Sequence, residues 1–326
     1  MPLSLRRGTV TAVLERVPGL VRLEVDGVAC VAYPGLTGDV EDGDEVLVNV
    51  QARELELGSG GFDILYANLT RGLGLAVVEG AHVMKLPYTP LQHAVRHGEE
   101  ARPLVEQLDG MPVVCCSLHS QLAPAAAALS GWRVGYVQLA GGALPVALSD
   151  TVRLLRERGL VELAIGAGAC FGGDVDCVNV HSALAYAKAA GADAVICAIG
   201  PGIVGTGTAL GHGGLAAVEA AGAAAALAGR SVLALRVSAG DARDRHQGLS
   251  HHSLAVLSLA GPIDTAWPAG CPLGAAPELA TEIDVAGWRD ACSDLELSHM
   301  GRGADEDPWF FAAAFAAGRL AGSLLS

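Results

Sequence analysis

The sequence has few aromatic residues and few basic ones. Phe, Trp and Tyr make up 4% of its 326 residues, and 21 Lys and Arg stand against 35 Asp and Glu, so the net charge is −14 at pH 7 with His neutral. Nucleic-acid binding needs a basic face and aromatic stacking platforms, and docking to acidic lipids needs a polybasic segment. The composition therefore excludes nucleic acid and a membrane surface as expected partners.

A long unbroken apolar run and a secretory leader are also lacking. Residues 192–210 carry one charge but are interrupted by four Gly and one Pro, and residues 211–229 consist mainly of Ala and Gly. A membrane-spanning helix needs about 20 mostly apolar residues. Arg6 and Arg7 are not followed by the apolar stretch of a signal peptide. We expect a cytoplasmic protein.

The eight cysteines include no CxxC pair and no zinc-ribbon spacing. Cys115, Cys116 and Cys197 lie within apolar, strand-like runs, which is typical of buried reduced thiols in a cytoplasmic protein. Cys170 has a similar apolar setting but stands beside a glycine-rich turn. A catalytic thiol at Cys170 is therefore the alternative to a structural one.

The first seventy residues alternate between apolar and polar positions, as strands with one buried face do. Asp26-Gly27 separates two such runs, and this pair favours a tight hairpin turn because both residues tolerate positive φ. We predict a small antiparallel barrel of five or six strands over 1–70, then a connector over 71–110 with a strand at 75–78 and a helix from Leu91. The expected barrel strands are 9–14, 21–25, 28–33, 45–50 and 62–65.

From residue 111 onward, short apolar runs alternate with helix-length stretches. Alternating β and α units with fully apolar strands predict a parallel sheet covered on both faces. We therefore expect a doubly wound, Rossmann-like α/β domain over 111–326. Its predicted strands are 113–116, 134–137, 163–166, 194–197, 232–235 and 295–297. Its predicted helices are 149–158, 175–190, 215–228, 284–292 and one that starts at Pro308.

Ligands of an open parallel sheet bind beyond the carboxyl ends of its strands, so the loops after the predicted strands are the expected site. The loop 200–208 follows one strand, leads towards a helix and is rich in glycines and hydroxyls, which suits an anion. The alternative is a tight turn in which Gly permits close packing. The loop matches neither the P-loop nor the dinucleotide fingerprint, so neither ATP hydrolysis nor NAD is expected.

The segment 241–252, DARDRHQGLSHH, has seven ionisable groups in twelve residues. Two arginines in it are suited to phosphate or carboxylate, and an Asp could orient a His. Ser250 is the expected N-cap of the next helix, and a His at a helix N-terminus is favoured in its neutral form. Adjacent histidines on a helix diverge by about 100°, so His251 and His252 are not expected on one metal. A divalent metal elsewhere in the segment and an exposed polar loop remain the alternatives.

Other strand-end loops contribute single candidates. His119 follows the first predicted strand, Asp174 the third, and Arg302 stands between two glycines where it could clamp a ligand. Acids 305–307 precede a helix that starts with proline, and they are expected to be caps. The histidines expected on the surface or in packing are His82, His93, His97, His181 and His212.

Five segments resemble a bacterial family, domain of unknown function 3866. The segments are MKLPYTPLQ at 84–92, FGGD at 171–174, GPGIVGTGT at 200–208, DARDRHQGLSHH at 241–252 and MGRG at 300–303. The resemblance implies a bacterial cytoplasmic protein with a β-rich front and an α/β remainder. It carries no activity, substrate or catalytic residue to transfer.

We expect a protein that binds, and could turn over, a small anionic metabolite such as a phosphorylated or nucleotide-like one. The candidate catalytic residues are His246, Asp241, His252 and His119. The candidate ligand-binding residues are Gly202, Gly205, Thr206, Thr208, Arg243, Arg245, Arg302 and Asp174. The alternative is a non-catalytic regulatory or assembly protein whose loops form a subunit interface, and the Ala- and Gly-rich helices leave room for a homo-oligomer. Convergence of these side chains in one place favours the first function, and a flat spread favours the second.

Overall fold

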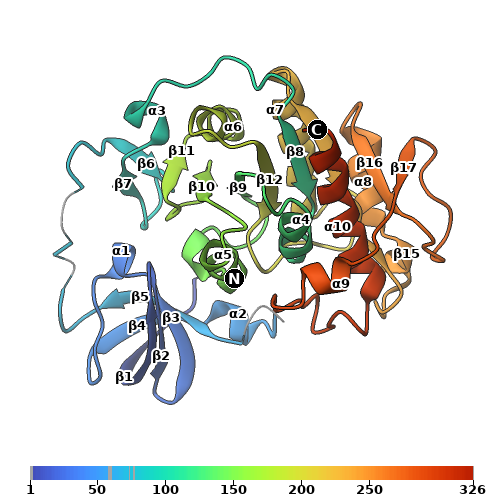
Figure 1. Ribbon diagram of the computed structural model, residues 1–326. Helices are drawn as coiled ribbons and strands as arrows, with labels where there is room; N and C mark the ends of the chain where they lie inside the picture. The colour runs from blue at the N-terminus through green and yellow to red at the C-terminus, as the bar shows by residue number, and fades with distance from the viewer. Residues whose placement is uncertain (1–2, 58–60, 73, 76–77, 326) are drawn as a thin grey trace. The chain divides into compact units, whose positions relative to one another are not determined.

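The computed structural model describes residues 3–57, 61–72, 74–75 and 78–325, and the chain divides into the units Met1–Val95 and Arg96–Ser326. The first unit holds a closed barrel with strand order β1-β2-β3-β5-β4, drawn in blue in Figure 1. Asp26 and Gly27 have φ of 51° and 76° and make the predicted hairpin turn between β2 and β3. The barrel prediction is confirmed, with five strands, except that the pairing of β3 with β5 is parallel whereas the other four are antiparallel. They are β1 (Leu5–Val17), β2 (Leu20–Val25), β3 (Val28–Ala32), β4 (Glu45–Asn49) and β5 (Asp63–Asn68).

The barrel core is filled by alternate side chains of these strands. Val21, Leu23 and Val25 of β2 are each at most 2% exposed, because successive strand residues point to opposite faces. Two short helices, α1 (Pro34–Thr37) and α2 (Gln51–Glu54), connect strands of the barrel.

The end of the first unit is a short hairpin. Strand β6 (Val83–Lys85) pairs antiparallel with β7 (His93–Val95), so the helix predicted from Leu91 is wrong. The nearest helix is the short α3 (Gly98–Ala101) of the second unit, and it ends before Pro103, which disfavours helical geometry in the residue before it. Within the strand predicted at 75–78, residues 76–77 lie outside the described residues.

The second unit is built on an eight-stranded sheet in which every pairing is parallel, with order β11-β10-β9-β12-β8-β13-β16-β17. This confirms the doubly wound α/β prediction. In this order β8 lies between β12 and β13, so the loops that follow these three strands are neighbours at the carboxyl edge. The strands are β8 (Pro112–Cys116), β9 (Val134–Leu139), β10 (Leu163–Ala167), β11 (Val175–Cys177), β12 (Ala194–Ile199), β13 (Arg230–Ala234), β16 (Asp264–Pro268) and β17 (Ala280–Ile283).

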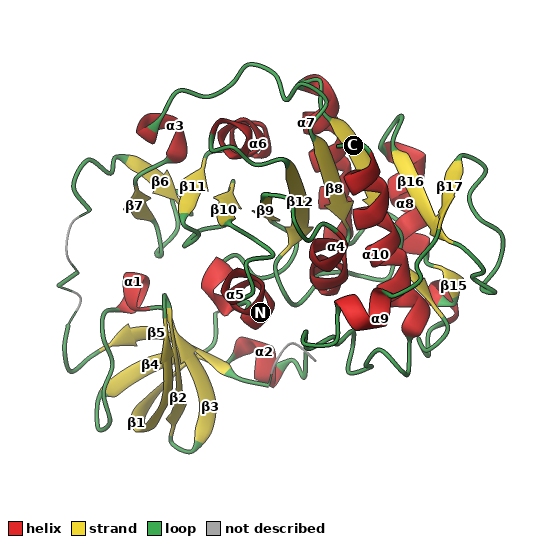
Figure 2. Ribbon diagram, viewed as in Figure 1, coloured by secondary structure: helices red, strands yellow, loops and turns green. Residues whose placement is uncertain are grey.

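Helices cover both faces of the sheet (Figure 2). Val113 and Cys115 of β8 pack in a core with α6, α7 and α8, whereas Val114 and Cys116 pack in a second core with α4, α5 and α10. The alternation of strand side chains therefore supplies both layers. The helices are α4 (Leu122–Ala128), α5 (Asp150–Glu157), α6 (Val180–Ala189), α7 (Ala216–Ala226), α8 (His251–Leu259), α9 (Trp288–Ala291) and α10 (Pro308–Ser323).

Several predicted elements of this unit differ from the structure. The strand predicted at 295–297 is not formed, and the helix predicted at 175–190 starts with the short strand β11. The helix predicted at 284–292 is reduced to the one turn of α9. Strands β16 and β17 were not predicted, because each mixes polar or proline residues into a short run. No helix in the described part of the chain is long and apolar enough to cross a membrane.

Candidate functional site

The segment after β13 folds back across the carboxyl edge of the sheet. It contains β14 (Val237–Ser238), the short helix η4 (Asp244–His246) and β15 (Gly248–Leu249), which pairs antiparallel with β14. Helix α8 then begins at His251. The Ser250 Oγ accepts the backbone N–H of His252 at 3.2 Å, so the predicted N-cap is confirmed.

Asp241 is the centre of a buried ion-pair network. Its side chain is 2% exposed and accepts hydrogen bonds from Arg236 Nη2 at 2.8 Å, from Arg243 Nε and Nη2 at 2.8 and 2.9 Å, and from Arg302 Nη2 at 3.4 Å. Burial alone would raise the pKa of Asp241, but the hydrogen bonds and charges of Arg243 and Arg236 hold it well below the ordinary value. The carboxylate is therefore charged and fixes three guanidinium groups around it.

Arg236 is a functional candidate that the sequence analysis missed. Its side chain is 2% exposed, its Nη1 lies 3.3 Å from Nδ1 of His252, and its Nε has no hydrogen-bond partner among the described residues. Burial lowers the pKa of Arg236 to about 10, although Asp241 opposes this shift. The sequence does hold a signal for Arg236. It directly follows the apolar run 232–235, so its charged side chain is expected at the carboxyl edge of the sheet.

Asp307 belongs to the same network and is not the helix cap that was predicted. It occupies the N-cap position of α10, but its side chain caps no N–H of that helix. Instead it is fully buried and accepts hydrogen bonds from Ser238 Oγ at 2.5 Å, Ala239 N at 3.1 Å and Arg302 Nε at 3.3 Å. Asp307 thus ties the loop after β13 to the loop that carries Arg302.

Three imidazoles converge beside this network. His246, His251 and His252 each offer one ring nitrogen, and these nitrogens all lie within 4.8 Å of one another. The ring centroids of His251 and His252 are 4.5 Å apart, although the two residues are adjacent in the helix. The expectation that they diverge is wrong. These residues form the first turn of α8, where no preceding turn restricts χ1, so both rings can rotate to the same side.

His212 joins the three imidazoles from the loop after β12. Its ring stacks on that of His252 with centroids 3.8 Å apart. The prediction of an ordinary surface or packing residue therefore missed its place in the cluster. We refer to His212, His246, His251 and His252 as the histidine cluster.

The histidine cluster is held in its neutral form. Burial, followed by the charges of Arg236 and Arg243, lowers the pKa of His246 to about 3. Burial also lowers the pKa of His252 to about 2, and it lowers those of His212 and His251. A neutral imidazole has a free lone pair, so it can accept a hydrogen bond or bind a metal.

The glycine-rich loop after β12 is arranged differently from the expected anion cradle. Helix α7 begins only at Ala216, so Gly202, Gly205, Thr206 and Thr208 do not lie at its N-terminus. The four residues are exposed, and the hydroxyls of Thr206 and Thr208 bond to each other at 2.9 Å.

Close packing explains part of the glycine content of this loop. A Cβ at Gly200 would overlap the carbonyl oxygen of Ala143, which follows β9. Gly207 lies against Arg245, since a Cβ there would be 3.5 Å from Nη2 of that guanidinium. The loop therefore borders the segment 241–252. These contacts explain why glycines are needed in the loop, but they give no role to its hydroxyls.

Two predicted site residues are placed apart from the network. His119 bonds to Ser149 Oγ at 2.7 Å and to the carbonyl of Ile199 at 3.1 Å, and burial lowers its pKa to about 4. Asp174 pairs with Arg156 and accepts the N–H of Ala164 at 2.8 Å.

Asp174 therefore lies beside the start of β10, at the amino edge of the sheet and not at the carboxyl edge where it was expected. Strand β11 is parallel to β10, so the chain must return to the amino edge of the sheet before β11 begins. Asp174 lies on this return. Cys170 in the same turn is fully buried, in agreement with a structural thiol.

His299 lies close to the network, and its burial makes the stability of the protein depend on pH. It is 3% exposed, stacks on Phe310 with centroids 3.8 Å apart, and bonds to Ser120 Oγ at 3.0 Å. Burial, with the charges of Arg236 and Arg302, lowers the pKa of His299 from 6.5 to about 3.

We expect protein stability to fall as the pH falls below 6.5. The folded state keeps His299 neutral, so the unfolded chain takes up a proton first, and this contribution is complete above pH 6.5 and declines towards pH 3. Between pH 7 and 5 it amounts to about 2 kcal/mol. The free energy of unfolding of the wild type and of His299→Asn, measured in urea at both pH values, checks this. The variant should lose about 2 kcal/mol less than the wild type, and an equal loss would contradict the assignment.

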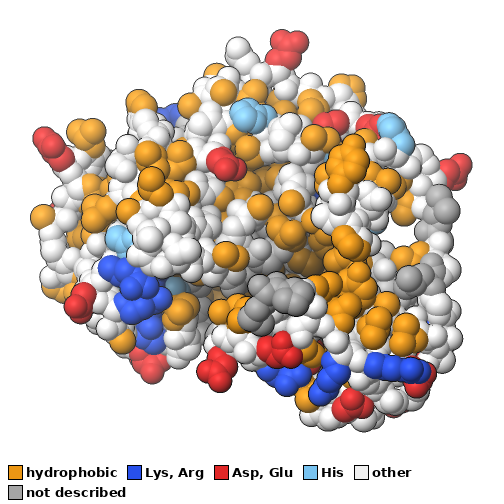
Figure 3. Space-filling view, turned by 180° about the vertical axis from the view of Figure 1, so that it is seen from behind, with side chains coloured by type: hydrophobic (Ala, Val, Ile, Leu, Met, Phe, Trp, Pro, Cys, Tyr) orange, Lys and Arg blue, Asp and Glu red, His pale blue; other side chains and the backbone are white. Residues whose placement is uncertain are grey.

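The charge around the network is opposite to that of the chain as a whole. Three guanidinium groups, those of Arg236, Arg243 and Arg302, pair with the two buried carboxylates of Asp241 and Asp307, which leaves an excess of one positive charge. Arg245 is exposed and makes no ion pair with a residue that the structure describes. Asp and Glu side chains are scattered singly over the face shown in Figure 3. The network is therefore a local basic site on an acidic protein.

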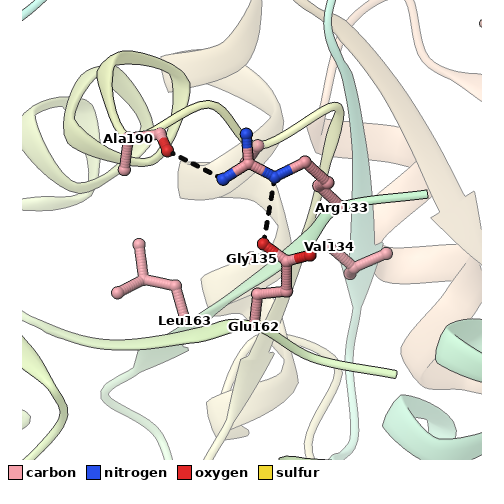
Figure 4. A pocket seen from close by; sticks show the side chains of 7 residues that line it. Arg133, Val134, Gly135, Glu162, Leu163 and Ala190 are labelled. Atoms are coloured by element: carbon pink, nitrogen blue, oxygen red, sulfur yellow. Dashed lines mark hydrogen bonds and ion pairs between the residues drawn. The ribbon is translucent and has the colours of Figure 1, made fainter. Parts of the chain in front are cut away.

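Two cavities of the second unit lie away from the network. One, of about 520 Å³, lies at the carboxyl ends of β9 and β10 and is lined by Asn179, His181 and Glu219, among others. The other, of about 170 Å³, is at the amino edge of the sheet (Figure 4). There Arg133 bonds to Glu162 at 3.0 Å and to the carbonyl of Ala190 at 3.3 Å, so its guanidinium is used within the fold.

Comparison with known proteins identifies the family. No curated protein matches the sequence. The family described as "Protein of unknown function (DUF3866)" matches residues 29–268, about three quarters of the chain. The match includes the segment 241–252 and ends before Arg302. The chain is therefore a member of the DUF3866 family.

Proposed function

We propose that the carboxyl edge formed by the loops after β8, β12 and β13 binds a small anionic metabolite with a phosphate or carboxylate group. The observation that carries the proposal is the buried carboxylate of Asp241, which holds three guanidinium groups together. Arg243 uses Nε and Nη2 on Asp241, which leaves its Nη1 for a ligand. Guanidinium groups fixed in this way bind oxyanions at a low entropic cost.

The convergence of the side chains supports this function over a subunit interface. Asp241, His252 and Arg302 are connected through direct contacts with Arg236 or with one another, and His246 lies 4.9 Å from His252 between ring centroids. The neutral imidazoles beside the arginines can accept hydrogen bonds from a bound ligand.

The chemistry of the thiols supports a cytoplasmic location. All eight cysteines are free, and seven of them are buried. Free thiols persist in a reducing compartment, whereas secreted proteins of this size usually pair theirs.

Titration with inorganic phosphate tests the proposal. We expect Arg243→Ala to weaken phosphate binding about 10- to 100-fold, because a hydrogen bond to a charged group contributes about 1.5–3 kcal/mol. Arg230→Ala is the matched control. Arg230 starts β13 at the opposite edge of the sheet and pairs with Asp264, so the variant removes the same charge away from the proposed site.

Isothermal titration calorimetry of the wild type and both variants, in a chelating buffer, gives the comparison. Binding that weakens in Arg243→Ala and is unchanged in Arg230→Ala supports the site. Equal weakening in the two variants would mean that only overall charge matters, and the proposed site would then be rejected.

A further inference from the structure

We infer that His246, His251 and His252 hold one transition-metal ion of the zinc class. Their ring nitrogens lie within 4.8 Å of one another, so modest side-chain movement brings all three to a common ion. His246 comes from η4, and His251 and His252 form the first turn of α8. The Ser250 hydroxyl contacts both elements. Two of the rings, those of His246 and His252, are at most 6% exposed, so the ion would be largely shielded from water.

His246 is oriented as a metal ligand usually is. Its Nδ1 lies 2.7 Å from Ser250 Oγ, which leaves Nε2 for an ion. The Ser250 hydroxyl oxygen has two lone pairs, so it can accept both the Nδ1–H of His246 and the backbone N–H of His252. A hydrogen bond on the far ring nitrogen fixes the tautomer and the ring direction of a metal-binding histidine.

His251 supplies the second observation. Its Nε2 is buried and has no hydrogen-bond partner in the described part of the chain. A buried polar atom without a partner is unfavourable, and such an atom in a native protein needs an explanation. A metal ion bound to this nitrogen would provide the missing partner.

His252 is the ligand whose surroundings must change. Its Nδ1 faces Arg236 Nη1 at 3.3 Å, so Nε2 is the nitrogen left for the ion. Coordination through Nε2 places the ring proton on Nδ1, which can then no longer accept from Arg236. We expect this long contact to open on metal binding. Arg236 keeps its bond to Asp241 at 2.8 Å, and that carboxylate offsets the repulsion between guanidinium and metal.

The donor set determines the class of metal. Three imidazoles suit zinc, cobalt, nickel, copper or iron, whereas magnesium and calcium prefer oxygen ligands. Three protein ligands also leave one position of a tetrahedral ion open. Metal binding does not depend on the proposed anion site. Only the use of the open position, next to the anion that Arg243 would hold, rests on that proposed function.

Cobalt titration of the full-length protein, after removal of metal with a chelator, tests the inference. Co²⁺ bound to three imidazoles gives a visible absorption band, and we expect saturation at one equivalent. His251→Ala should weaken Co²⁺ binding more than about 100-fold, since loss of even an outer hydrogen-bond partner costs about 10- to 100-fold. His181→Ala is the matched control, because His181 is an exposed histidine of α6 outside the cluster, and it should bind as the wild type does.

The outcomes separate the metal from the anion. Absence of a saturable band in the wild type, or His251→Ala with wild-type affinity, would overturn the metal site. His251→Ala is preferred to His246→Ala because His251 is only half-buried, and circular dichroism confirms that the variant is folded. Phosphate binding in chelator without Co²⁺ binding would reject the metal site and retain the anion site. Co²⁺ binding without phosphate binding would retain the metal site and reject the anion site.

Discussion

Replacing Asp241 with alanine should lower the free energy of unfolding by about 3–5 kcal/mol. The Arg236 side chain is as buried as Asp241, and Asp241 is its only carboxylate partner in the described part of the chain. The substitution leaves a buried guanidinium without its counter-charge and brings it into repulsion with Arg243 and Arg302. Removing one partner of a buried ion pair costs far more than the pair contributes overall, because the remaining charge stays desolvated.

An exposed ion pair of the same type provides the control for this prediction. Arg289 bonds to Asp305 at 2.9 Å, but the Asp305 side chain is 95% exposed. Asp305→Ala should therefore change the free energy of unfolding by less than about 1 kcal/mol. Urea unfolding of both variants and the wild type gives the comparison. If Asp241→Ala costs no more than Asp305→Ala, the network does not hold the loop after β13 in place.

Substitution of Gly318 by alanine should destabilise the protein by about 1–3 kcal/mol. Gly318 lies in α10 where that helix crosses α4. A Cβ at this position would overlap the carbonyl oxygen of Ala125 and lie 2.7 Å from the Cβ of Ala128. Backbone and a methyl group cannot move aside as a flexible side chain can, so the two helices must separate. Because Asp307 is the N-cap residue of α10, this separation should also loosen the network.

Gly222 is the matched control, since it is also a helical glycine but has open space around it. Apart from its chain neighbours and the backbone of its own helix, no described residue has an atom within 4 Å of a Cβ built at Gly222 in α7. Gly222→Ala should therefore stabilise the protein by about 0.5–1 kcal/mol, because alanine is the better helix former. Urea unfolding should show opposite signs for the two variants. Stabilisation by both would contradict a close crossing of α4 and α10.

The fold was largely predictable because its main strands are continuous apolar runs. Strands such as β8 and β12 are buried on both faces, and a fully apolar run has few other structures open to it. Strands β11 and β17 were missed for the opposite reason. β11 has three residues, and β17 lies at the edge of the sheet with only partly buried or exposed side chains, so neither produces a hydrophobic pattern.

The candidate site was predicted in part, because strand-end loops can be assigned from the strands alone. The segment 241–252 was singled out in this way. Asp241 and Arg243 lie in the network, and His252 lies beside it. Partners from other parts of the chain were not predictable. His212 stacks on His252 only because β12 and β13 flank β8, and the role of Asp307 depends on how α10 meets Ser238. The local sequence predicts a helix cap at Asp307, but in the structure its side chain bonds to Ser238 and Arg302 instead.

Anomalous diffraction from crystals soaked in tungstate would locate an anion bound at the carboxyl edge of the sheet. Tungstate is a tetrahedral dianion like phosphate, and its tungsten atom is located without reference to any assumed ligand. We expect an anomalous peak in contact with the guanidinium of Arg243, next to the histidine cluster, that is lost in crystals of Arg243→Ala. A strong peak only at other arginines, such as Arg230, with none at Arg243 would contradict the proposed anion site.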